Sequence, residues 1–126
     1  MAKRDMTGAI HAERLLANAG GDAGLADEVL GLFAQQAELW LRLLDDATGA
    51  DGFRDAAHSL KGTALGVGAT DMADACARAE AGADGDLGVR SALARRVRDE
   101  AARALADAAA WRHERLLQSL RTPARG

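Results

Sequence analysis

The chain of 126 residues carries 16 Lys and Arg against 19 Asp and Glu, which gives a formal net charge of −3. This length supplies one modest hydrophobic core, so we expect a single domain over residues 1–126. The mild acidity argues against nucleic acid as a partner, because binding to a phosphate backbone needs a basic face. No stretch approaches the roughly 18 consecutive apolar residues of a membrane span, so no membrane partner is expected.

The composition favours helices over strands. Alanine, the strongest helix former, supplies about half of the apolar residues, whereas Val and Ile are scarce. The only proline, Pro123, lies near the end of the chain, so the helices contain no internal breaker. The single cysteine, Cys76, excludes an internal disulfide, and the first residues lack the apolar run of a signal peptide. We therefore expect an all-α domain in the reducing cytoplasm.

Gly, Asp and Thr residues divide the sequence into five helical segments. The first is expected over residues 7–18. The second is expected over residues 22–48, with Asp22 as its N-cap. Steps of three and four residues predict that one apolar face of this second helix packs against the core. That face comprises Leu25, Val29, Leu32, Phe33, Trp40, Leu43 and Leu44.

The third helix is expected over residues 53–65 with Asp51 as its N-cap, and the fourth over residues 71–81 with Thr70 as its N-cap. The last, over residues 87–120, would be roughly 50 Å long, against roughly 40 Å for the second helix. Short loops make neighbouring helices antiparallel, which predicts an up-down four-helix bundle that the short first helix caps. The long C-terminal helix must then overhang, bend or pair. We expect a monomer, with a dimer through that helix as the alternative.

The helix expected over residues 53–65 carries the chemistry. At 100° per residue, one narrow apolar stripe faces the bundle. It comprises Phe53, Ala56, Ala57, Leu60, Ala64 and Val67. His58 projects about 140° away from Phe53, so its imidazole is expected to be exposed. The residues three or four positions from His58 are its neighbours on the helix surface, and these are Arg54, Lys61, Gly62 and Leu65.

These neighbours suit an exposed nucleophile that another protein approaches closely. Lys61 can neutralise an anion held at the ring. Gly62 costs about 1 kcal/mol in a helix relative to Ala, and its bare backbone leaves room for a partner. Leu65 adds an apolar contact, and Arg54 is a second candidate for contact with a partner.

The residues His58, Leu60, Lys61, Gly62 and Gly68 form the pattern H-x-L-K-G, followed by a glycine ten residues after the histidine. This pattern resembles the signature of histidine-containing phosphotransfer (HPt) domains of bacterial phosphorelays. The resemblance covers about residues 8–110 and leaves residues 111–126 as a C-terminal extension. It implies an antiparallel four-helix bundle in which His58 accepts a phosphoryl group from a receiver-domain aspartyl phosphate and passes it to another receiver.

The resemblance also implies the partners of the chain. They are response-regulator receiver domains and a sensor or hybrid histidine kinase, and the receiver domain supplies Mg²⁺. We expect no cofactor of the chain's own, because the sequence contains no glycine loop for a nucleotide. Some family members have a Gln 22 residues after the histidine, where this chain has Glu80. Glu80 either orients the imidazole or is a simple surface charge, and as a carboxylate it would repel a phosphoryl group nearby.

Three other functions compete with the carrier. The chain could be an interaction module that binds or inhibits a kinase or receiver without transferring phosphate, or a detached phosphoacceptor domain of the chemotaxis-kinase type. A metal-binding bundle would need histidines that converge on the interior, and His11, His58 and His113 are not expected to do so. We interpret the one basic cluster as a solvated helix face in which acidic residues lie between the arginines. It comprises Arg90, Arg95, Arg96, Arg98 and Arg103.

Overall fold

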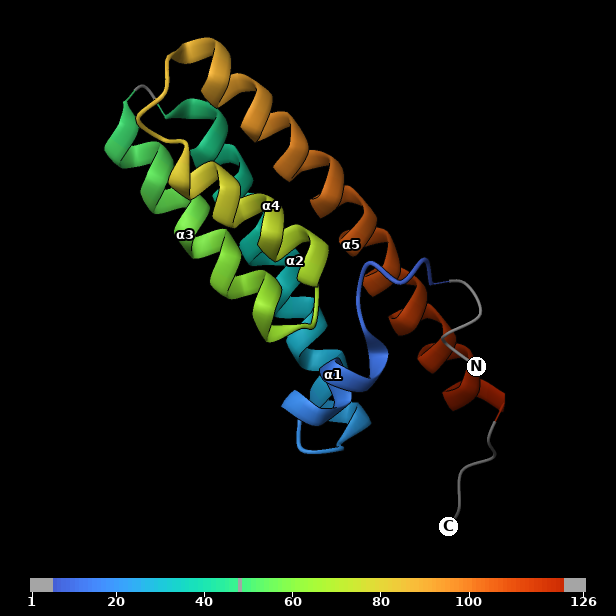
Figure 1. Cartoon of the computed structure of the whole chain (residues 1–126). Coiled ribbons are helices and arrows are strands. Elements are labelled where there is room, and N and C mark those ends of the chain that lie inside the picture. Colours follow the sequence, from blue (N-terminus) through green and yellow to red (C-terminus); the bar gives the residue numbers. More distant parts are fainter. Residues whose placement is uncertain (1–5, 48, 122–126) are drawn as a thin grey trace.

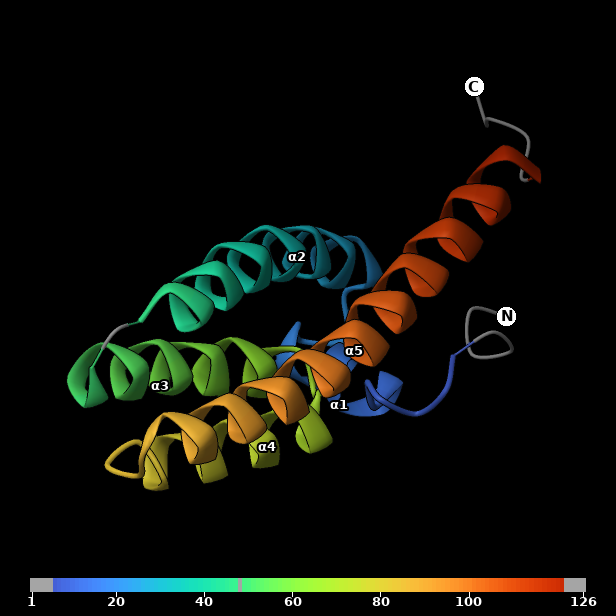
Figure 2. The same cartoon turned by 90° about the horizontal axis from the view of Figure 1, so that it is seen from above.

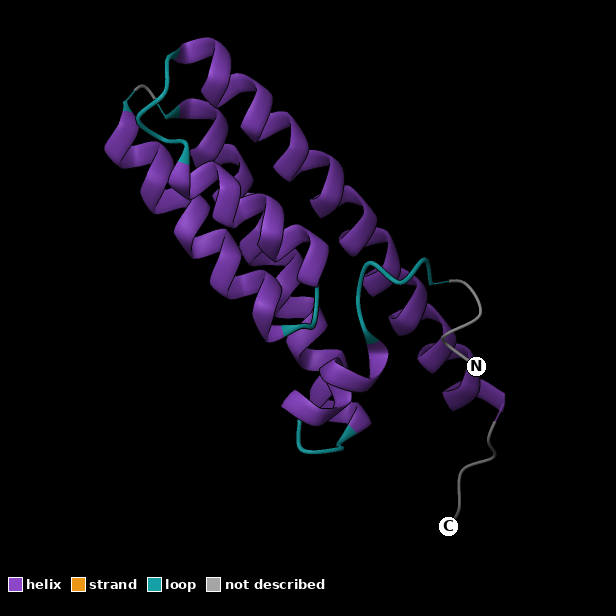
Figure 3. Cartoon of the chain, viewed as in Figure 1, coloured by secondary structure: helices purple, strands orange, loops and turns teal. Residues whose placement is uncertain are grey.

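The computed structural model describes residues 6–47 and 49–121, and over these ranges its regular elements are five helices (Figure 1). They are α1 (Ala12–Asn18), α2 (Ala23–Asp46), α3 (Ala50–Gly66), α4 (Thr70–Ala81) and α5 (Leu87–Arg121). Helices α2 to α5 run alternately up and down, and α1 packs against one end of α2 (Figure 3). The expected all-α, antiparallel four-helix bundle with a short N-terminal cap is confirmed. None of the described helices is long and apolar enough to cross a membrane.

Alanine lets the helices of this bundle pack closely. The predicted stripe on α3 is buried throughout, and Met72, Cys76 and Ala79 face the core from α4 as expected. Of the six apolar residues that α5 buries, four are alanines and the others are Val97 and Trp111. Helix α3 contacts α2 and α4, and α5 contacts the same two helices from the other side, so α2 and α4 lie at opposite corners of the bundle.

The predicted inner face of α2 is wrong in part. The side chains that α2 buries are Ala26, Leu30, Phe33, Ala37 and Leu44. By contrast, Leu25, Leu32 and Leu43 are 45%, 54% and 43% exposed. The buried set lies about 100° around the helix from these leucines, so α2 turns a different side of its apolar surface toward the neighbouring helices.

The predicted start of α2 is confirmed, whereas the predicted starts of α3, α4 and α1 need correction. Asp22 is the N-cap of α2, as expected, and accepts a hydrogen bond from the backbone N–H of Leu25 at 3.1 Å. Gly49 takes the N-cap position of α3, so Asp51 lies inside the first turn. Thr70 is the first residue of α4 rather than its cap, and its hydroxyl lies 3.0 Å from Nε2 of His11.

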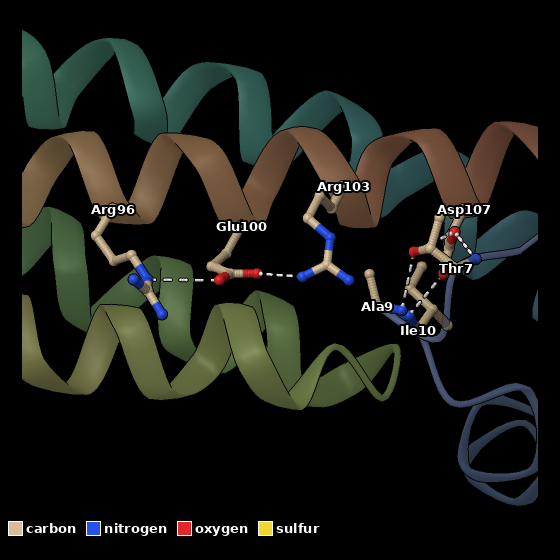
Figure 4. A network of polar contacts seen from close by, with 7 residues as sticks. All are labelled: Thr7, Ala9, Ile10, Arg96, Glu100, Arg103 and Asp107. Carbon is tan, nitrogen blue, oxygen red and sulfur yellow. Dashed lines mark hydrogen bonds and ion pairs between the residues drawn. The ribbon is translucent and has the colours of Figure 1, made fainter.

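The third correction concerns the N-terminal segment, because α1 begins at Ala12 and not near residue 7. The residues before it are held by Asp107 of α5, whose carboxylate is 1% exposed. It accepts hydrogen bonds from the backbone N–H groups of Thr7 and Ile10 (Figure 4). These tertiary bonds draw residues 7–10 across α5 in a non-helical path, which helical propensity alone does not predict.

Helix α5 extends past the end of the bundle, which is one of the three outcomes that its length left open (Figure 2). Trp111 is buried, whereas Leu116 and Leu120 are 57% and 74% exposed. The basic cluster of α5 is largely paired. Arg98 forms an ion pair with Asp45 of α2, and Glu100 binds both Arg96 and Arg103 (Figure 4). This agrees with the interpretation of the cluster as a solvated helix face.

Candidate phosphotransfer site

Helix α3 holds His58 on the outside of the bundle. Ala57, directly before His58, and Leu60, two residues after it, have no exposed surface and fix the rotation of α3. The His58 side chain, pointing the other way, is 68% exposed. The histidine is therefore rigid at its backbone and open to solvent at its ring, as the helical projection leads us to expect.

Glu80 of α4 lies directly beside His58. Its Oε2 atom is 3.0 Å from Nδ1 of the imidazole, and its Oε1 atom accepts a hydrogen bond from Nζ of Lys61 at 2.9 Å. A single carboxylate thus joins the histidine and the lysine. An ionised carboxylate only accepts hydrogen bonds, so Nδ1 is the donor in this contact, and the neutral imidazole then has its lone pair on Nε2.

The charges around Glu80 keep it ionised. The hydrogen bond from Lys61 lowers the pKa of Glu80 most, and the hydrogen bond from His58 lowers it further, against the opposing effect of partial burial. Cys76 lies in the core near this pair, and burial raises the pKa of its thiol to about 12. The thiol is therefore protonated at neutral pH and serves as a small core residue.

Gly62 leaves open space one turn after His58. A Cβ atom added at Gly62 would meet no atom within 4 Å. Packing inside the chain therefore does not require glycine here, and alanine would form a better helix. Leu65, one turn further along, is 51% exposed. Together they give the surface beside the histidine a flat backbone and an apolar edge.

Gly68 has a different reason to be glycine. Its φ is +74°, and an added Cβ would lie 3.1 Å from the carbonyl oxygen of His11 and from Cβ of Arg14. Its own carbonyl accepts a hydrogen bond from the backbone N–H of His11 at 3.0 Å. The Nδ2 group of Asn18 donates to the last carbonyls of α3, at Leu65 and Gly66. The α1 region therefore caps the C-terminal end of the helix that carries His58.

Arg54 has acidic partners within the chain. Its guanidinium lies 3.0 Å from Asp51, one turn earlier on α3, and 2.7 Å from Asp84 in the loop after α4. The hydrogen bond to Asp84 is the main reason that the pKa of Arg54 is raised. The sequence pattern did not identify Asp84 or Asn18, because neither lies at helical spacing from His58.

The structure brings His58, Lys61, Gly62 and Glu80 together on one surface, with Arg54 and Leu65 at its margins. An exposed Nε2 lone pair beside an ammonium group can attack an electrophile carried by another protein. In the part of the chain that the structure describes, no group of three or more His, Cys, Asp or Glu side chains is arranged to hold a metal ion.

Comparison with known proteins agrees with this arrangement. The family model of the Hpt domain matches residues 26–111. The chain is also similar to the crystal structure of the histidine phosphotransferase ShpA from Caulobacter crescentus. The two are 40% identical with a TM-score of 0.74, over 90% of this chain and 100% of that one. Comparison with curated proteins gives no match. With the family match over more than half of its residues, the chain belongs to the Hpt domain family.

Proposed function

We propose that this protein is a phosphorelay intermediate that carries a phosphoryl group on Nε2 of His58. The observation that supports the proposal best is the exposed imidazole whose Nδ1 atom is engaged by Glu80. In the transfer step the Nε2 lone pair attacks the phosphorus of an aspartyl phosphate on a receiver domain. The P–N bond forms, the P–O bond to the aspartate breaks, and the carboxylate stays on the receiver. The reverse step, on a second receiver, releases the phosphoryl group.

Glu80 acts here as a positioning residue. By accepting a hydrogen bond from Nδ1–H it leaves Nε2 unprotonated, and it stabilises the positive charge that the ring gains as the P–N bond forms. Its partner Lys61 offsets the repulsion between the carboxylate and the incoming phosphoryl group. Because Lys61 is 31% exposed, its ammonium group has room to move from Glu80 toward the phosphoryl oxygens.

Gly62 and Leu65 form the surface on which the receiver docks. The bare backbone at Gly62 lets the aspartyl phosphate approach the ring, and Leu65 contributes an apolar contact. Arg54 lies at the edge of the same surface, and its pairs with Asp51 and Asp84 orient it for contact with the partner.

We place the reaction in the cytoplasm, a compartment that suits the free thiol of Cys76. The partners in this proposal are receiver domains of response regulators and a sensor or hybrid histidine kinase. The receiver supplies Mg²⁺ and the activated phosphoryl group, and the chain needs no cofactor or ATP site of its own.

The decisive experiment incubates the protein with a receiver domain that carries a labelled aspartyl phosphate. We expect a label on this chain that is labile to acid and stable to alkali, the signature of phosphohistidine. The variant His58→Gln should remain unlabelled. The matched control His113→Gln, which changes an exposed histidine on α5, should be labelled like the parent protein.

Two other outcomes would identify the competing functions. Tight binding of the receiver without any label would indicate an interaction module that inhibits without transfer. Labelling by a kinase and ATP in the absence of a receiver would indicate a detached phosphoacceptor domain of the chemotaxis-kinase type.

A further inference from the structure

Helix α2 carries a second apolar face that the rest of the described chain leaves about half exposed. We call it the seam, and it consists of Leu25, Val29, Leu32, Gln36, Leu39 and Leu43. Its four leucines are between 43% and 54% exposed. Figure 2 shows α2 along one side of the bundle, with α3 and α5 on its inner side. Four half-exposed leucines in line on one helix form a contiguous patch rather than scattered surface residues.

The spacing of the seam is that of a coiled coil. Its residues follow one another in alternating steps of four and three from Leu25 to Leu43, which is nearly three heptads. Five of the six positions are apolar, and the sixth is Gln36 near the middle. The fully buried residues of α2 lie beside this row, and of the seam residues only Val29 also packs against the core. The helix therefore carries one apolar face for its own core and a separate one with heptad spacing.

The charges that flank the seam identify its partner. Glu28, Gln35 and Arg42 repeat every seven residues along the side of the seam away from the core, and all three are exposed. Glu28 and Arg42 are separated by about 21 Å along α2, so they cannot pair within one chain. Their midpoint is Gln35. An antiparallel second copy of α2, centred on Gln35, would bring Glu28 of each copy to Arg42 of the other.

This pattern excludes a parallel arrangement of the same helices. In a parallel pair the Glu28 side of one seam would meet the opposite side of the other, which is occupied by Phe33 and Trp40. Those residues pack toward the bundle core, so the charges would have no partners there. Only the antiparallel arrangement uses the apolar row and both charges at once, as a two-fold interface requires.

We propose that the protein forms a two-fold homodimer through antiparallel contact of the α2 seams, with Glu28 of each copy paired to Arg42 of the other. The seam lies on α2, whereas His58 pairs with α4 at the opposite corner of the bundle. The dimer interface is therefore separate from the imidazole and its Glu80 partner, and this inference does not depend on the phosphotransfer function.

Sedimentation equilibrium of the full chain tests the proposal. We expect a mass that rises from monomer to dimer with concentration. The double variant Leu32→Glu, Leu39→Glu should remain monomeric. The matched control Leu87→Glu changes a leucine that is 71% exposed outside the seam, and it should dimerise like the parent protein.

Charge reversal gives the sharper test. Glu28→Arg alone and Arg42→Glu alone each replace two attractive pairs by two repulsive ones, so each should weaken dimerisation by about tenfold. The double variant Glu28→Arg, Arg42→Glu should recover it. A mixture of the two single variants should form a heterodimer, because every pair is then attractive. A variant that had lost its fold would also fail to dimerise in the mixture, so loss of folding cannot produce this result.

Three outcomes would overturn the proposal. The first is a parent protein that is still monomeric at about 1 mM. The second is a dimer that survives Leu32→Glu, Leu39→Glu and is lost on changing Leu116 and Leu120, which would place the contact on α5. The third is a monomeric parent protein whose binding to a receiver domain is lost in the seam variants, which would make the seam a receiver-docking surface instead.

Discussion

Thr7 and Asp107 are 100 residues apart in the sequence and share two hydrogen bonds. The backbone N–H of Thr7 donates to Oδ1 of Asp107 at 2.7 Å, and its hydroxyl donates to the same oxygen at 3.0 Å. The other carboxylate oxygen accepts from the backbone N–H of Ile10 at 3.0 Å, in a fully buried position. One side chain on α5 thus fastens the N-terminal segment that leads into α1.

We expect Asp107→Ala to lower the free energy of unfolding by about 2–4 kcal/mol, because buried donors lose their acceptor. Asp107→Asn should cost less, since the amide oxygen still accepts one of the bonds. Urea denaturation measures the effect. Asp99→Ala, on the exposed side of the same helix, is the control and should change the free energy by less than about 0.5 kcal/mol. Equal effects at both positions would contradict the conclusion that Asp107 holds the N-terminal segment against α5.

Removal of the Glu80 carboxylate should slow phosphoryl transfer to His58. We expect Glu80→Ala to reduce the rate about tenfold, which corresponds to the loss of roughly one hydrogen bond of 1.4 kcal/mol. Glu80→Gln retains an acceptor for the Nδ1 proton and should reduce the rate less. The ¹⁵N spectrum of the imidazole provides the specific readout, because the fraction of His58 protonated on Nδ1 should fall in Glu80→Ala. Unchanged rates and an unchanged tautomer would make Glu80 a plain surface charge.

The same carboxylate predicts how stability depends on pH. The pKa of Glu80 is lowered in the folded chain from its ordinary value of 4.5. Between those two values the unfolded chain binds more protons, so stability rises with pH in that window. The contribution of Glu80 is fully present above pH 4.5 and is lost as the pH falls through the lower, folded-state pKa. Urea midpoints between about pH 3 and pH 6 should therefore depend less on pH in Glu80→Gln than in the parent protein.

Two glycines near the site should respond in opposite ways to alanine. Gly62→Ala should raise the free energy of unfolding by up to about 1 kcal/mol, since alanine favours the helix and an added Cβ meets open space. The same change should slow transfer from a receiver. Gly68→Ala should lower the free energy of unfolding by about 1–2 kcal/mol, because its φ is positive. Thermal unfolding and the transfer assay together check both changes.

A Gly62→Ala protein that is more stable and transfers at the normal rate would contradict the proposed role in access. A Gly68→Ala protein as stable as the parent would contradict the steric argument at the end of α3.

Much of the fold follows from local sequence signals. Glycines near the helix ends and alanine-rich stretches give the order and approximate limits of the helices, and the stripe of Phe53, Leu60 and Val67 identifies the inner face of α3. The inner face of α2 is different, since Leu25 and Leu32 have the right spacing but lie outside the core. On a helix with two apolar faces, the spacing of the apolar residues fits either face as the one toward the core. Only the packing of the whole bundle decides which face is buried.

The candidate site likewise contains some contacts that the sequence predicts and others that depend on the packing of the helices. His58, Lys61 and Gly62 are neighbours on one helix, so helical geometry alone brings them together. The contact with Glu80 crosses from α3 to α4 and depends on how those helices pack, which the sequence indicated only through a family resemblance. The pairing of Arg54 with Asp84 depends on the path of the loop after α4, and no spacing rule predicts it.

Only three residues, 67–69, connect the helices that carry His58 and Glu80, and all three are buried. A connection this short and this well packed leaves the two helices no freedom to slide past each other. A donor and an acceptor would therefore meet the same rigid template, with the ring and its carboxylate already aligned. On such a template we expect the choice between competing partners to depend on the shape and charge of the visiting protein and not on a rearrangement of these two helices.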